Sequence, residues 1–105
     1  MIVTTGYTVA EGEIIETIGI VRGNTIRAKH VGTDIIASLR NLVGGEVGEY
    51  TKLMAEAREQ AYDRMVTHAQ SVGADAIIGV SFTTSMITQG AAEILAYGTA
   101  VKLKR

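Results

Sequence analysis

The order of apolar and polar residues predicts strands at both ends of the chain. Residues 13–29, 74–88 and 93–104 repeat with a period of two and contain many β-branched side chains, which is typical of strands. A short apolar segment at 1–5 predicts a further strand. In the three longer segments neither side is strongly polar, although a sheet with one solvated face has a polar side. We therefore expect the second face of the sheet to be buried between subunits.

Two helices are predicted between these strands. Over 34–43 the apolar residues recur at helical spacing, and the Thr33 hydroxyl can cap the first free N–H groups. Over 50–72 a second apolar stripe lies opposite a polar side, and Gly73 is a typical residue at which a helix ends.

Small residues occur at several positions within the predicted strands. Gly23 and Asn24 predict a bend, bulge or turn inside 13–29. Ala96, Gly98 and Ala100 lie on one side of the last strand, where they would let a helix approach the sheet closely.

The predicted order is two strands, two helices and two strands in a single domain, 1–105. Strands grouped around helices favour an α+β fold, an antiparallel sheet with two helices on one face. With 105 residues, of which 47% are hydrophobic, the chain has much aliphatic surface for one small core. This surplus agrees with a face that is covered by other subunits.

Charge and composition exclude several classes of site. Ten basic and eleven acidic residues give a net charge of −1, without the basic patch that nucleic-acid binding needs, so no nucleic-acid partner is expected. The chain has no cysteine, which excludes disulfides, thiolate metal sites and cysteine nucleophiles. No apolar run reaches the length of a membrane span, and the first residues do not resemble a signal peptide. The sequence predicts a cytoplasmic protein with no membrane partner.

Three segments of the chain resemble the YbjQ family of small bacterial and archaeal proteins: "TTGYTVAEGEIIETIGIVRGNTI", "LRNLVGGEVGEYTKLMAEAREQA" and "GADAIIGVSF". Their most specific parts are the double glycine followed five residues later by Tyr50, and the Gly-Ala-Asp-Ala-Ile-Ile-Gly-Val run that begins a strand. The resemblance implies a dodecin-like α+β sandwich assembled as a homopentamer. The family is labelled as heavy-metal-binding, its physiological role is otherwise not established, and it offers no catalytic residues to transfer.

The two histidines are the first metal ligands to consider, because imidazole suits zinc, copper and nickel. His68 lies within the apolar stripe of the second helix, which favours a core or interface histidine with one satisfied nitrogen over a metal ligand. His30 is the candidate metal ligand, because a cyclic assembly places one copy per subunit in a ring. The cofactor itself stays open, and a divalent metal ion is the one that the family label suggests.

The hinge between the two predicted helices is the other candidate site. Its glycines would let backbone N–H groups approach a ligand, next to the positive end of a helix dipole. The simpler interpretation is a tight turn, in which Gly44 ends one helix and carboxylates begin the next. The candidate ligand-binding residues are Arg40, Asn41, Gly44, Gly45, Glu46, Glu49 and Tyr50.

The sequence thus leaves two functions open. The leading hypothesis is a homo-oligomer, a pentamer, that binds a metal or small ligand at subunit junctions near the hinge. The alternative is a structural scaffold that binds a partner protein. No serine, threonine or lysine stands in a recognisable catalytic context, so we do not expect an enzyme.

Overall fold

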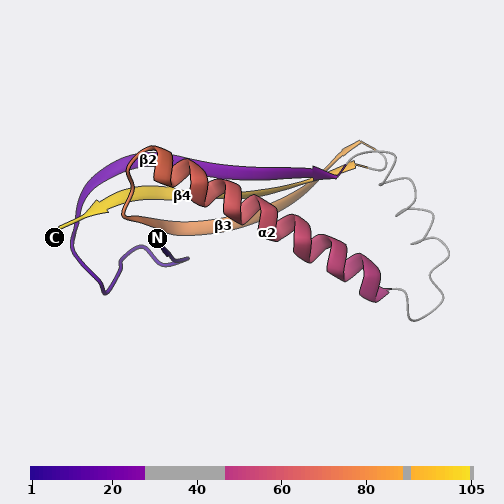
Figure 1. Ribbon diagram of the computed structural model, residues 1–105, viewed down its shortest axis with the longest axis horizontal. Coiled ribbons are helices and arrows are strands. Elements are labelled where there is room, and N and C mark those ends of the chain that lie inside the picture. Colours follow the sequence, from indigo (N-terminus) through magenta and orange to yellow (C-terminus); the bar gives the residue numbers. More distant parts are fainter. Residues whose placement is uncertain (28–46, 89–90, 105) are drawn as a thin grey trace.

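The computed structural model describes residues 1–27, 47–88 and 91–104. They form four strands and one long helix (Figure 1). In chain order the elements are β1 (Ile2–Val3), β2 (Ile14–Arg27), α2 (Val47–Ser71), β3 (Ala76–Thr88) and β4 (Ala91–Leu103). The predicted helix over 34–43 lies outside the described residues.

The four strands form one sheet in the order β1-β3-β4-β2. β4 pairs antiparallel with both β2 and β3, as predicted, but β1 pairs parallel with β3. The prediction of a purely antiparallel sheet is therefore wrong, and the α+β sheet is mixed. β1 and β2 lie on opposite edges, so the chain between them crosses the sheet instead of forming a hairpin.

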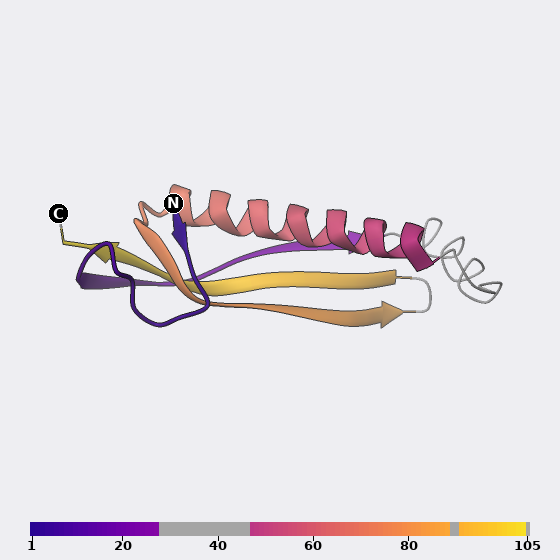
Figure 2. The ribbon, with the colours of Figure 1, turned by 90° about the horizontal axis from the view of Figure 1, so that it is seen from below.

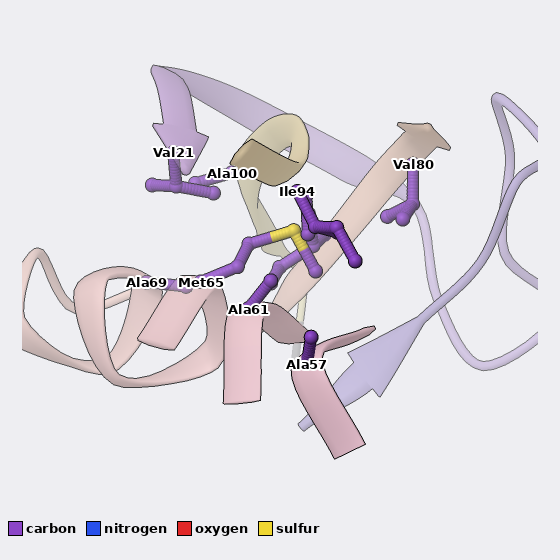
Figure 3. Close-up of a cluster of buried hydrophobic side chains, with 10 residues drawn as sticks. Val21, Ala57, Ala61, Met65, Ala69, Val80, Ile94 and Ala100 are labelled. Atoms are coloured by element: carbon purple, nitrogen blue, oxygen red, sulfur yellow. The ribbon is translucent and has the colours of Figure 1, made fainter. Parts of the chain in front are cut away.

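α2 covers one face of this sheet, chiefly over β2 and β4 (Figure 2). The side chains that it buries recur every four residues and belong to one cluster with buried residues of the strands (Figure 3). The helical members are Ala57, Ala61, Met65 and Ala69, all fully buried. The predicted apolar stripe is thus confirmed from Ala57 to Met65 but does not extend to Val72, which is 40% exposed. Small residues dominate the buried positions because the helix lies very close to the strands.

A glycine of β2, Gly23, makes this close approach possible. A Cβ at Gly23 would lie well inside van der Waals contact with the backbone of Ala61 and Met65. On β4, a Cβ at Gly98 would lie 2.7 Å from Cγ2 of Ile77, so Gly98 leaves space for a side chain of the neighbouring strand β3. The prediction of a bend at Gly23 is wrong, because β2 pairs with β4 without interruption from Gly19 to Arg27. Gly23 leaves space for the helix instead.

The end of α2 shows why Gly73 was a reliable stop signal. Gly73 has a φ of +77°, and its N–H donates to the Gln70 carbonyl (3.1 Å) while the Ala74 N–H donates to the Ala69 carbonyl (3.0 Å). This pair of bonds is a Schellman motif, which satisfies the last helical carbonyls. The chain then turns directly into β3.

The sheet face away from α2 is covered at one end. Residues 4–13 cross this end, where Val9 packs on a small cluster formed by Ala76, Val101 and Leu103. Further along the same face, Ile20 and Ile26 are 74% and 53% exposed. The burial of this face between subunits remains a prediction.

The molecule is long and thin, with extents of 54 × 23 × 15 Å. A single helical layer on a single sheet accounts for the smallest of these dimensions. In the described part of the chain, no helix combines the length and the apolar character needed to cross a membrane.

Candidate functional site

Most residues of the predicted site lie outside the described ranges. These are His30, Arg40, Asn41, Gly44, Gly45 and Glu46. Glu49 and Tyr50 are described as part of the first turn of α2, which begins at Val47, three residues before the predicted start. Glu49 therefore belongs to the N-terminus of a helix, where a carboxylate is stabilising.

The described residues contain a group of polar contacts around the edge of β2. On α2, His68 accepts a hydrogen bond at Nδ1 from the backbone N–H of Arg22 (3.2 Å). One turn earlier, Nη1 of Arg64 donates to the carbonyl oxygen of Asn24 (2.6 Å). On the other sheet face, Nδ2 of Asn24 donates to Oε2 of Glu93 on β4 (3.0 Å). Together these contacts join α2, the edge strand β2 and the sheet face away from the helix.

The two backbone groups that bond to α2, the N–H of Arg22 and the C=O of Asn24, point away from β4. In an antiparallel pair the N–H and C=O of one residue point to the same side, and successive residues alternate. Arg22 and Asn24 therefore present their polar backbone groups to the outside of the sheet, where two helical side chains satisfy them. The helix fixes its own position over β2 in this way and closes the middle of that edge.

The prediction for His68 agrees with this geometry. Its Nδ1 is used by Arg22, which leaves Nε2 as the one remaining ligand atom of the ring. Among residues 1–27, 47–88 and 91–104, no group of three or more His, Asp or Glu side chains is placed to hold a metal ion. His68 thus makes a structural contact between α2 and β2 through Nδ1.

Replacing His68 with alanine is expected to lower the free energy of unfolding by about 0.5–1 kcal/mol, the net value of one hydrogen bond beside solvent. His68→Gln offers an acceptor oxygen on a side chain of similar reach and is expected to restore part of this loss. Urea denaturation of the two variants and the parent checks the difference. Equal stability of the alanine and glutamine variants would contradict a role for the acceptor.

The sequence did not reveal the contact between Arg64 and the edge strand. The spacing of four residues between Arg64 and His68 shows that they share a helix face, but it does not show which strand that face meets. Asn24 and Glu93 are separated by 69 positions, so their pairing depends on the register of β2 and β4.

Two of the recognisable sequence motifs meet in the structure. The N–H of Gly79 donates to the Gly6 carbonyl (2.8 Å), and the N–H of Val80 donates to the Thr4 carbonyl (3.1 Å). Gly79 has a φ of +60°, and a Cβ there would lie 3.0 Å from Cε1 of Tyr7. The N-terminal "TTGY" therefore docks on "GADAIIGV", and these residues have a structural role in the fold.

Comparison with known proteins gives the family. A family model described as "Putative heavy-metal-binding", YbjQ, matches residues 1–104. The chain belongs to the YbjQ family. A UPF0145 protein of Archaeoglobus fulgidus is 55% identical over 104 residues, which cover 99% of this chain and 96% of the relative. A UPF0145 protein of Methanosarcina acetivorans is 57% identical, with coverage of 98% and 97%.

A solved structure shares the fold of this YbjQ-family chain. It is a protein with unknown function of the DUF74 family from Pediococcus pentosaceus, at a TM-score of 0.65 and 18% sequence identity. The match covers 99% of this chain and 98% of that one. The likeness concerns the fold alone.

Proposed function

We propose that this YbjQ-family protein is a non-enzymatic subunit of a closed homo-oligomer, a pentamer, that binds a divalent metal ion or a small ligand where subunits meet. The observation that carries the proposal is the thin, half-covered sheet. The helix and the sheet together measure only 15 Å along the shortest axis of the molecule, and Ile20 and Ile26 are largely exposed on the sheet face away from α2. This is apolar surface that a second subunit would cover.

The location of the ligand follows from the same arrangement. A cyclic assembly brings the same residue of every subunit around one axis, so one histidine per chain becomes a ring of imidazoles. His30 is the residue that we assign to such a ring. The start of α2, with Glu49 in its first turn and the glycine-rich segment before it, is the second place where a junction would gather ligand groups.

A native mass spectrum of the untagged protein, purified without chelator, tests both parts of the proposal. We expect a mass of five subunits, and an added mass per ring that identifies a bound metal or ligand. Zinc, nickel or copper added to the chelated protein is expected to raise its melting temperature, and His30→Ala is expected to remove that rise while leaving the assembly intact. His68→Ala is the matched control, because it removes the other imidazole and should keep the metal response.

Other outcomes would change the proposal. A monomer at micromolar concentration would contradict the assembly. A pentamer that ignores all three metals and co-purifies with another protein would replace the binding function by that of a scaffold.

A further inference from the structure

His68 joins α2 to the edge of β2 through a ring atom that can also bind a proton. Its Nδ1 accepts the backbone N–H of Arg22 (3.2 Å), which an imidazole can do only while this nitrogen carries no proton. Protonation would turn the acceptor into a donor, and the N–H of Arg22 would then face a second donor. Histidine is the side chain whose charge ordinarily changes between pH 5 and 8. The contact therefore requires the neutral ring.

Cationic side chains surround this contact on three elements. Arg64 lies one turn before His68 on the same side of α2, and a carbonyl oxygen of β2 accepts a bond from its Nη1 (2.6 Å). On β4, Nζ of Lys102 lies beside Gly73, 3.7 Å from the position that a Cβ would take there. The edge strand itself contributes Arg22. Like charges four residues apart on a helix destabilise it, so a positive ring beside the fixed guanidinium of Arg64 is unfavourable.

Two carboxylates belong to the segments around this end of α2. Glu16 lies directly opposite Lys102 in the register of β2 and β4, and Oδ2 of Asp75 accepts a backbone N–H of β4 (2.9 Å). In the part of the chain that the structure describes, the ring of His68 has one polar contact, the bond from Arg22. Within those residues no carboxylate therefore pairs with the ring to balance a positive charge.

The end of a helix ordinarily favours a positive charge, because its last carbonyl groups have no helical partner. In α2 these carbonyl groups are already occupied. Oγ of Ser71 donates to the carbonyl oxygen of His68 (2.6 Å), and the N–H groups of the Schellman motif bond to the next two carbonyls. The ammonium group of Lys102 also lies beside this turn. The helix end thus does little to favour a charged ring over the neutral one.

We propose that the bond between His68 and Arg22 is a pH-sensitive contact, which holds the end of α2 on β2 at neutral pH and opens as the pH falls toward 5. At pH 8 the neutral ring stabilises the folded protein through this bond. As the pH falls, the protonated ring loses the bond and is repelled by Arg64. The inference goes beyond the proposed function, because it concerns a contact within one subunit.

Amide hydrogen exchange at Arg22 tests the proposal, with each rate divided by that of an unstructured amide at the same pH. In the parent, protection of this amide is expected to fall about three- to tenfold from pH 8 to pH 5, the effect of one lost hydrogen bond. His68→Asn is the matched control, because Oδ1 of asparagine takes the position of Nδ1 and does not titrate, so Arg22 should keep its protection. The N–H of Val21 points toward β4, and its protection should respond to pH equally in both proteins.

Nitrogen chemical shifts of the imidazole give a second readout, which needs no variant. At pH 8 the ring is expected to carry its proton on Nε2, since Nδ1 is the acceptor. A proton on Nδ1 at this pH would overturn the proposal. So would an Arg22 amide whose protection stays constant in the parent, or falls equally in the parent and in His68→Asn. All these outcomes leave the proposed function untouched.

Discussion

Replacing Gly23 with alanine is expected to destabilise the protein by about 3 kcal/mol or more, the largest effect of any conservative change in the described residues. The added Cβ would overlap the backbone of Ala61 and Met65, and it would lie 2.7 Å from the carbonyl carbon of Arg64. Backbone atoms of a helix cannot turn aside as the end of a flexible side chain can. α2 would have to move away from β2, which would separate the alanines and Met65 from the strands.

Urea denaturation measures this loss, at a fixed protein concentration because the apparent stability of an oligomer depends on concentration. Gly6→Ala is the matched control. A Cβ at Gly6 would lie 3.5 Å from Oγ1 of Thr4, an ordinary contact, so its stability should change by about 0.5 kcal/mol or less. A Gly23→Ala variant as stable as Gly6→Ala would show that the helix does not lie against β2 as described.

The long elements were predictable because their signals are local. The period of two in β2, β3 and β4 and the stripe on α2 follow from strand and helix geometry alone. The end of α2 was predictable for the same reason, since Gly73 is required by the turn next to it. The small residues Ala96 and Ala100 were also recognised, and both lie in the core beneath α2.

The errors in the predicted fold arose where distant segments meet. β1 has only two residues, too few for their pattern to show whether they pair parallel or antiparallel. Its direction is set by the crossing segment that brings Thr4 and Gly6 to Val80 and Gly79. Gly23 was predicted to bend its strand because the sequence does not show the helix that lies on it. A glycine in a strand is explained equally well by a β-bulge or by the close approach of another backbone segment.

The site was predicted less well for a related reason. The prediction that His68 is a core or interface residue could use its position in the apolar stripe of the helix. The hydrogen bond that Nδ1 accepts from Arg22 agrees with that prediction. The contacts of His68 and Arg64 with the edge of β2 depend on how α2 lies on the sheet and have no local signature. The contact between Asn24 and Glu93 depends on the register of two strands and joins residues 69 positions apart. The roles of His30 and of the hinge at Arg40 to Glu46 stay predictions.

Met65→Ala is expected to lower the free energy of unfolding by about 3 kcal/mol, because it deletes a fully buried side chain at the centre of the contact between α2 and the sheet. Figure 3 shows Met65 extending from the helix toward the strands, close to Ile94. Alanines on both sides of it along α2 offer no side chain that could fill the cavity.

Met65→Leu nearly conserves the volume and should cost less than about 1.5 kcal/mol. Gln70→Ala, at an exposed position of the same helix, should change stability by about 0.5 kcal/mol or less. If urea denaturation ranked Met65→Ala with Gln70→Ala, the core would not be organised around this methionine, and the close packing of α2 on β2 would need another cause.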